Sequence, residues 1–301
     1  MDGRHGWVLV VLALLGGCGN PAPGPVTAPP SAVPGTPPAP VPGTSAPPEP
    51  APGPSPAPQP DGGGERVAVP VYYVADTAAG PRLQREFHAV VTDDPASAAV
   101  QEMLAAPTGI DPDYRSHWPA GSALRGPVRR EGGAIVVDLT GVGSGPSDPH
   151  LAELTVQQLV YTVQGAMQST DPVRILVDGS TESALWGSVD TSAPIGRGDP
   201  YAVRSLVQID SPADDTQVGR EVEVSGEAAV WEATVRWAVL RDGAVVREGV
   251  ASTAEGQRFA PFAFTVTLEP GQYTVRISED DPSDGEGRPV LSDDKRVTVS
   301  G

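Results

Sequence analysis

Four histidines are the first side chains of this 301-residue chain to consider for catalysis. His88, His117 and His150 lie in unrelated contexts, and none belongs to a His-Glu-x-x-His motif, whose spacing places two imidazoles on one helix face to hold zinc. His117 precedes Trp118, and the pair could line a ligand pocket, although a packed loop is the simpler interpretation. No serine lies in a Gly-x-Ser-x-Gly motif. The sequence therefore predicts no catalytic set and no enzyme.

Two aspartates at strand ends and one glycine-rich loop are the next candidates. Asp138 and Asp178 each follow a predicted strand, where paired carboxylates could act as general acid and base. A turn or cap role is the simpler interpretation, since Asp178 precedes Gly179. Residues 141–145 have the glycines of a phosphate loop but lack its lysine and helix entry, so we expect a flexible loop.

The acidic run at residues 280–286 is the candidate metal site. An EF-hand loop needs oxygen ligands at positions 1, 3 and 5 and a glutamate at position 12. Counted from Asp280, the third position is Pro282 and the twelfth is Leu291. The motif fails, so we expect a solvated acidic loop, with a weak calcium contact as the alternative. The sequence predicts no metal and no cofactor.

The one cysteine of the chain, Cys18, follows an apolar run at residues 7–15 and two glycines. The run of about nine residues suits a signal peptide and is too short to span about 30 Å of hydrocarbon. Leu15-Gly16-Gly17-Cys18 resembles the lipobox of bacterial lipoproteins. The resemblance implies a signal peptide over residues 1–17, cleavage before Cys18 and a lipid anchor on its thiol. An ordinary secretory signal that contains a cysteine is the alternative.

The segment behind Cys18 is rich in proline. Residues 21–60 hold 18 of the 35 prolines of the chain and one charged residue, Glu49. Such a composition cannot bury a core and favours extended polyproline II. At ~3.1 Å per residue, about 40 residues would reach on the order of 120 Å. We therefore expect residues 18–64 to be a disordered stalk that holds the folded part away from the membrane.

The net charge argues against two classes of partner. The chain carries −18, of which residues 1–64 contribute −2 and the rest −16. This balance opposes binding to nucleic acid and direct docking on anionic lipid headgroups. Lys295 is the one lysine of the chain, while arginine is common, which the codon bias of a GC-rich genome explains. The remaining residues, about 237, suffice for two domains that rely on hydrophobic cores.

Residues 65–204 mix strand and helix signals, which predicts an α+β domain with a mixed sheet covered by two helices. Val69, Val71 and Tyr73 alternate as one face of a strand, and Pro70 suggests an edge position. Asp-Pro pairs at residues 94–95 and 148–149 each supply an N-cap and a first helical residue. The first helix must end before Pro107.

Residues 205–301 lack helical periodicity and contain short strands at regular spacing. This texture predicts an all-β immunoglobulin-like sandwich. Trp231, Val235 and Trp237 alternate along one long predicted strand, so we expect both tryptophans in the core. Asp242-Gly243 predicts a tight hairpin turn.

Residues 67–200 resemble the GerMN domain of sporulation and germination proteins. The resemblance rests on residues 103–108 (Met-Leu-Ala-Ala-Pro-Thr), 118–122 (Trp-Pro-Ala-Gly-Ser), 133–139 (Gly-Ala-Ile-Val-Val-Asp-Leu) and 177–179 (Val-Asp-Gly). Residues 206–299 resemble the immunoglobulin-like domain of bacterial spore germination, at residues 209–212, 224–228 and 231–233. GerMN domains resemble ring-building modules, and the companion domain implies a binding module. This chain has one GerMN unit, whereas the germination protein that names the family has two.

These observations predict a non-catalytic, lipid-anchored envelope protein on the extracytoplasmic face of the cell membrane. We expect the two domains to bind envelope protein partners, with no nucleic acid among them. Binding of wall polysaccharide, by exposed tryptophan and tyrosine stacked on sugar rings, is the alternative, and a wall-acting enzyme is a further one. The oligomeric state and any role in sporulation stay open.

Overall fold

The computed structural model describes residues 65–280, 286–287 and 289–301. All of them belong to one compact unit, which spans Gln59–Gly301. Cys18, the predicted signal peptide and the predicted stalk lie outside the described residues.

Residues 65–204 have an α+β fold, which confirms the predicted class. The elements are β1 (Glu65–Thr77), β2 (Gly80–Thr92), α1 (Pro95–Ala105), β3 (Tyr114–Arg115), β4 (Ala123–Leu124), β5 (Arg129–Glu131), β6 (Ala134–Thr140), α2 (Pro149–Ala166), β7 (Val173–Val177), β8 (Ala184–Leu185), β9 (Val189–Asp190) and α3 (Pro200–Val203). One sheet is mixed, as predicted, with the order β4-β6-β5 and with β7 parallel to β6. A second sheet, β2-β1-β3, is antiparallel, and the sequence did not separate it from the first.

Both long helices begin where the Asp-Pro pairs predict. The side chain of Asp94 accepts a hydrogen bond from the backbone N–H of Ser97 at the start of α1. The side chain of Asp148 accepts one from the N–H of Leu151 at the start of α2. Each carboxylate thus satisfies an amide that has no partner inside the helix. The first helix ends at Ala105, before Pro107 as expected.

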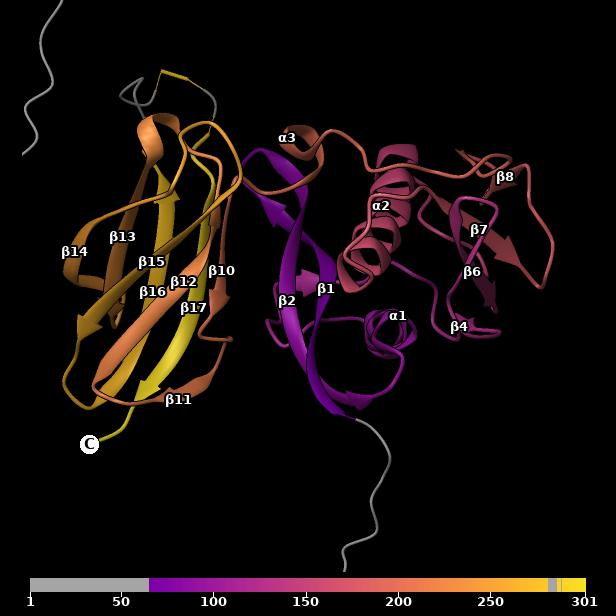
Figure 1. Ribbon diagram of the computed structural model, residues 1–301. Coiled ribbons are helices and arrows are strands. Elements are labelled where there is room, and N and C mark those ends of the chain that lie inside the picture. Colours follow the sequence, from indigo (N-terminus) through magenta and orange to yellow (C-terminus); the bar gives the residue numbers. More distant parts are fainter. Residues whose placement is uncertain (1–64, 281–285, 288) are drawn as a thin grey trace, which may run out of the picture. The chain divides into compact units, whose positions relative to one another are not determined.

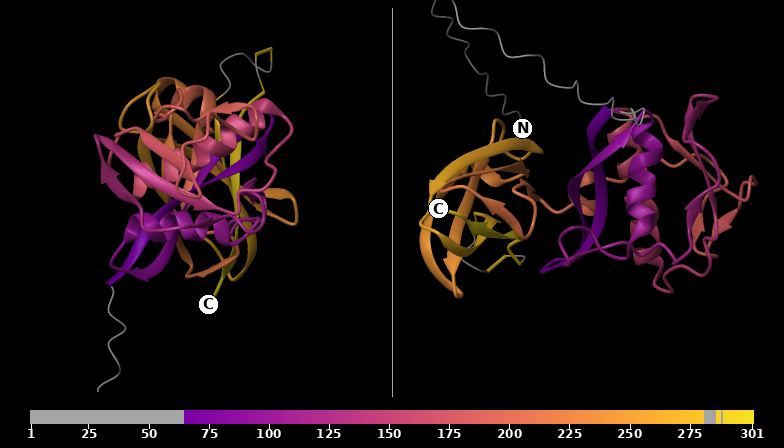
Figure 2. Two further views of the ribbon diagram at one scale, coloured as in Figure 1. Left: turned by 90° about the vertical axis from the view of Figure 1, so that its right-hand side faces the viewer. Right: turned by 90° about the horizontal axis from the view of Figure 1, so that it is seen from below.

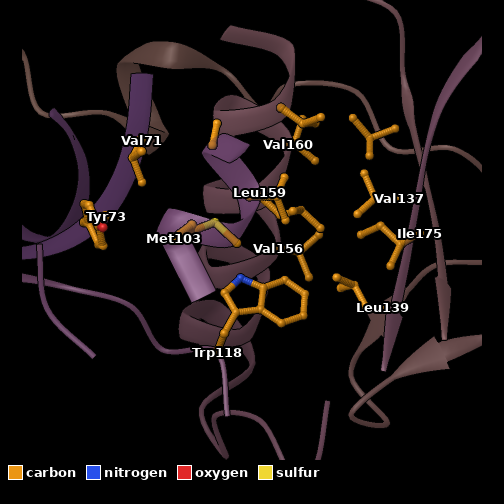
Figure 3. Close-up of a cluster of buried hydrophobic side chains, with 14 of the residues drawn as sticks. Val71, Tyr73, Met103, Trp118, Val137, Leu139, Val156, Leu159, Val160 and Ile175 are labelled. Carbon is orange, nitrogen blue, oxygen red and sulfur yellow. The ribbon is translucent and has the colours of Figure 1, made fainter. Parts of the chain in front are cut away.

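The two helices lie between the two sheets (Figure 1), and Figure 2 shows the same layers from below. Figure 3 shows the core between these layers, with Val71 and Tyr73 of β1 on one side of α2 and Val137 and Ile175 of the mixed sheet on the other. The prediction that Val69, Val71 and Tyr73 share one face of this strand is therefore confirmed, although Tyr72 and Val74 of the other face are buried as well.

Pro70 does not mark an edge strand, because β1 is the middle strand of its sheet. The predicted edge position is correct only for the backbone around Pro70 itself. β3 pairs with β1 at Val74 and Ala75 alone. Proline has no N–H to donate, and in the described residues no strand pairs with Pro70 on the side away from Phe87 of β2.

Residues 205–301 form the predicted β-sandwich. Its elements are β10 (Val207–Ser211), β11 (Thr216–Val218), β12 (Glu221–Ala228), the 3₁₀ turn η1 (Trp231–Ala233), β13 (Thr234–Arg241), β14 (Ala244–Ser252), β15 (Ala260–Thr267), β16 (Gly271–Glu279) and β17 (Ser292–Val299). The sheets β10-β12-β15 and β11-β17-β16-β13-β14 enclose one core. Asp242 and Gly243 have φ angles of 52° and 79°, as the predicted tight turn requires.

The prediction that Trp231 belongs to the core is wrong. The strand begins only at Thr234, because Glu232 and Ala233 have φ angles of 52° and 58° and turn the chain out of the strand. Trp231 is 53% exposed. Trp237 is half-buried and stacks on Phe264, with 4.8 Å between the ring centroids.

Candidate functional site

The two strand-end aspartates each hold the end of the neighbouring strand. Asp138 Oδ1 accepts a hydrogen bond from the N–H of Gly179 at 2.9 Å. Asp178 Oδ1 accepts one from the hydroxyl of Thr140 at 2.6 Å. Their carboxylates therefore have the turn role that the sequence favours.

Two of the remaining candidates lie in packed loops, and the third is exposed on a helix. Trp118 is buried and donates from Nε1 to the carbonyl of Thr155, so the loop that holds His117 is packed. The end of the loop at residues 141–145 is closely packed, since a Cβ on Gly145 would lie 2.1 Å from the ring of Trp186. His150 is exposed in the first turn of α2.

Most of the acidic run lies outside the described residues, because the structure does not describe residues 281–285. Asp280 itself pairs with Arg236. Within the part of the chain that the structure describes, no group of three His, Cys, Asp or Glu residues could hold a metal ion. No helix among the same residues has the length and apolar character to cross a membrane.

A buried ionic cluster forms around Lys295 on β17. This side chain is 2% exposed. Its ammonium donates to Asp111 Oδ2 at 2.6 Å and to the hydroxyl of Tyr114 at 2.7 Å, and it lies 3.4 Å from Asp293 Oδ1. The Tyr114 hydroxyl in turn donates to Asp293 Oδ1 at 2.7 Å. An ammonium has three donors, so lysine fits these three oxygens better than arginine would.

The pKa values of Lys295, Asp293 and Tyr114 are all raised in this cluster. Burial alone would lower the pKa of Lys295, but the carboxylates of Asp293 and Asp111 outweigh burial and raise it. Burial raises the pKa of Asp293, against the opposing effect of Lys295. Burial also raises the pKa of Tyr114. The lysine is therefore a charged structural residue, and it is not the neutral amine that a nucleophile requires.

Glu86 of β2 extends the cluster towards solvent. Its carboxylate accepts hydrogen bonds from the N–H groups of Ile110 and Asp111, at 2.9 and 2.7 Å. It also lies 3.2 Å from His88 Nε2, while His88 Nδ1 lies 2.9 Å from Glu102 Oε2. Burial would lower the pKa of His88, but the two carboxylates outweigh it and raise the pKa. The imidazole thus bridges the carboxylates of Glu86 and Glu102 and has a structural role.

A second ionic cluster ties β2 to the strands of the sandwich. Arg85 donates two hydrogen bonds to Asp210, at 2.6 and 3.1 Å. Arg204 pairs with Glu227 and donates to Gln208 at 3.1 Å. Such forked arginine–carboxylate contacts fix the geometry of both partners.

One face of the β1–β2 pair carries exposed apolar side chains, which we call the apolar shelf. It consists of the exposed residues Ala68, Phe87, Ala89 and Val91 together with the half-buried Pro70. Opposed residues of antiparallel strands share a face, and Pro70 opposes Phe87 as Ala68 opposes Ala89. Phe87 is 40% exposed and Val91 is 57% exposed. The opposite face, with Val69, Val71 and Tyr73, packs on the helices, and beyond Pro70 the shelf's own face is covered as well, since Tyr72 packs with Tyr161 of α2.

A pocket of about 330 Å³ lies at the Phe87 end of the shelf. Its lining includes Tyr72, Arg85, Phe87, Arg197, Arg204 and Glu227. Burial would raise the pKa of Glu227, but Arg204, Arg85 and Arg197 outweigh burial and lower it. Three guanidinium groups thus line the pocket with one carboxylate, on a chain whose net charge is strongly negative.

A third feature is a pair of exposed aromatic residues anchored to Gln257. The N–H of Gln257 donates to the carbonyl of Val230, next to Trp231, at 2.8 Å. The hydroxyl of Tyr201 donates to the carbonyl of Gln257 at 2.7 Å. Tyr201 is 47% exposed. The Tyr201 ring packs on Phe259, with 5.6 Å between the ring centroids, and an exposed aromatic ring can stack on a ligand.

Sequence reasoning missed both ionic clusters, the shelf and the arginine pocket. The one signal for the first cluster is that the chain has a single lysine, which the codon bias of a GC-rich genome also explains. The alternation of β2 was a signal for the shelf, because Phe87, Ala89 and Val91 recur every second residue. No sequence pattern joins Lys295 to Asp111, which lies 184 residues earlier.

The described residues thus define a two-part chain, an α+β domain followed by an immunoglobulin-like sandwich. Residues 70–183 match the family model "Sporulation and spore germination", and residues 206–286 match the "Immunoglobulin-like domain of bacterial spore germination". The chain carries both domains in this order, which confirms the resemblance seen in the sequence. The two families point to an envelope or sporulation protein and not to a known class of enzyme.

Two solved structures are similar to the chain. One is that of the tandem GerMN domains of the sporulation protein GerM from Bacillus subtilis, with 14% identity, a TM-score of 0.35, and coverage of 44% of this chain and 46% of that chain. The match therefore spans about half of that chain. The other is a putative lipoprotein from Clostridium perfringens, with 16% identity, a TM-score of 0.31, and coverage of 44% of this chain and 87% of that chain. No curated protein matches the chain significantly.

Proposed function

We propose that this chain is a non-catalytic, lipid-anchored protein on the extracytoplasmic face of the cell membrane, whose domains bind envelope protein partners. Cys18 would carry the lipid, and residues 18–64 would hold the folded part away from the bilayer. The lipobox-like sequence and the proline content support these two points.

The apolar shelf is the observation that carries the proposed binding function. Neighbouring exposed apolar side chains on the surface of a strongly acidic chain mark a site of interaction. Exposure of Phe87 and Val91 to water costs roughly 25 cal/mol for each Å² of apolar surface. A partner that covers these side chains would recover this free energy. A second copy of this chain is a poor occupant, because each copy carries a large negative charge.

Site-specific photocross-linking in intact cells tests this proposal. Amine-directed reagents are unsuitable, since the one lysine is buried. A photoreactive residue at position 89 should give a discrete protein adduct, which the substitution Phe87→Glu should remove. The matched control is a photoreactive residue in place of Val250, an exposed apolar residue of β14. Equal adducts at both positions, or an adduct at position 89 that survives Phe87→Glu, would contradict the proposal.

A second candidate function, binding of wall polysaccharide, is favoured by the exposure of Trp231. An exposed indole held on a turn with two positive φ angles is available to stack on a sugar ring. The solubilised lipoprotein should then co-sediment with isolated cell wall in a saturable and salt-resistant manner. Trp231→Ala should reduce this binding while Val250→Ala does not. Co-sedimentation that is unaffected by Trp231→Ala would rule the indole out.

A further inference from the structure

The pocket at the end of the apolar shelf holds three guanidinium groups in a small space. Arg85, Arg197 and Arg204 line it together with one carboxylate, Glu227. Asp210, which lies outside the pocket lining, holds Arg85. Three cations against two carboxylates leave an excess of positive charge at this point of an acidic chain.

Two of these arginines are fixed in place before any ligand arrives. The forked contact with Asp210 holds Arg85, whose guanidinium also lies 4.9 Å from the centroid of the Phe87 ring. Arg204 is held by Glu227 and lies 4.0 Å over the ring of Phe259. A preorganised cation loses little freedom when it binds an anion.

The same pocket retains unused hydrogen-bond donors. Arg197 is exposed and lies 4.8 Å over the ring of Tyr161, and among the described residues no carboxylate lies within ion-pair distance of it. Arg204 is 7% exposed, and its buried Nε has no hydrogen-bond partner. A buried donor without a partner is costly, so an acceptor in the pocket would be stabilising.

We propose that this pocket binds an acidic side chain of an extended partner segment whose apolar side chains cover the shelf. The inference rests on the proposed protein-binding function and adds the chemistry that would recognise the partner. Phe87 belongs both to the shelf and to the pocket, so one segment can fill both. A carboxylate on a peptide suits this site better than a free phosphate, because the apolar side chains of the same peptide can also cover Phe87 and the rest of the shelf.

A pair of model peptides tests the inference on the solubilised full-length lipoprotein by calorimetry at low salt. One is a five-residue peptide amide with aspartate between valine and leucine residues, and the other has asparagine in place of the aspartate. The acidic peptide should bind about tenfold more tightly, and Arg197→Gln should remove this difference. Arg258→Gln is the matched control, since Arg258 is exposed and pairs with Glu255.

The outcomes separate this inference from the proposed function. If the two peptides bind equally tightly and Phe87→Glu abolishes the binding of both, the carboxylate pocket is overturned and the shelf remains as a docking site. Loss of the acidic preference in Arg258→Gln, tighter binding of inorganic phosphate than of the acidic peptide, or no binding of either peptide would also overturn the pocket. The photocross-link at position 89 reports on the proposed function independently.

Discussion

Replacement of Lys295 by methionine should destabilise the folded unit severely. Methionine keeps most of the apolar stem, so the change chiefly removes the ammonium from between Asp111 and Asp293. Breaking a buried pair by removing one partner costs about 3–5 kcal/mol, because the other charge stays buried and uncompensated. For a chain of this size, each kcal/mol shifts the Tm by roughly 2–4 °C. We therefore expect the Tm to fall by roughly 6–20 °C.

Thermal and urea denaturation of the wild type and the variant would measure this loss. The control is Arg276→Met on the neighbouring strand, since Arg276 pairs with Asp294 at the surface and such pairs contribute about 0–1 kcal/mol. Adding Asp293→Asn to Lys295→Met should recover part of the stability, because it removes a buried charge. A loss below about 1 kcal/mol, no larger than that of Arg276→Met, would refute the reasoning.

Three further predictions concern single positions. Gly109→Ala should cost about 1–3 kcal/mol, because the new Cβ would lie 2.4 Å from Glu86 Oε2; an unchanged urea midpoint would argue against this close approach. The pKa of His88, between Glu86 and Glu102, is raised in the folded state. The protonated imidazole therefore contributes its whole stabilisation at a pH below the pKa of His88 in the unfolded chain, and this contribution is lost as pH rises through the pKa of His88 in the folded chain. The Tm difference between wild type and His88→Gln should therefore shrink from about pH 6 to pH 9, and a constant difference would be inconsistent with this charge. Cys18→Ser should abolish incorporation of labelled fatty acid and leave residues 1–17 uncleaved, as mass spectrometry of the chain would reveal; a labelled variant would disprove the lipid site.

Local signals in the sequence predicted much of the fold. Asp94 and Asp148 were recognisable as caps because an aspartate before a helix satisfies amides only two or three residues away. The turn at Asp242 and Gly243 was equally local. Alternation placed Val69, Val71 and Tyr73 on one face of β1, since side chains of a strand change face at every residue, but it did not show that Tyr72 and Val74 of the other face are buried too.

The binding features could not be predicted, because they depend on packing between distant segments. Alternation alone does not show that Trp231 lies outside the strand. The chain leaves the strand through positive φ angles at Glu232 and Ala233, and glutamate and alanine rarely adopt such angles. The exposure of Phe87 depends on which segments cover β2. The ionic partners of Lys295 depend on how β17 meets the loop after α1.

Occupancy of the apolar shelf in living cells tests the central claim most directly. Cys18 is the one cysteine of the chain, and acylation would block its thiol, so a cysteine introduced by Ala89→Cys or Val250→Cys can be labelled alone. The account predicts that a membrane-impermeant maleimide labels position 89 more slowly in intact cells than in the solubilised lipoprotein, while position 250 reacts equally in both. Equal labelling of position 89 in cells and in isolation would contradict it.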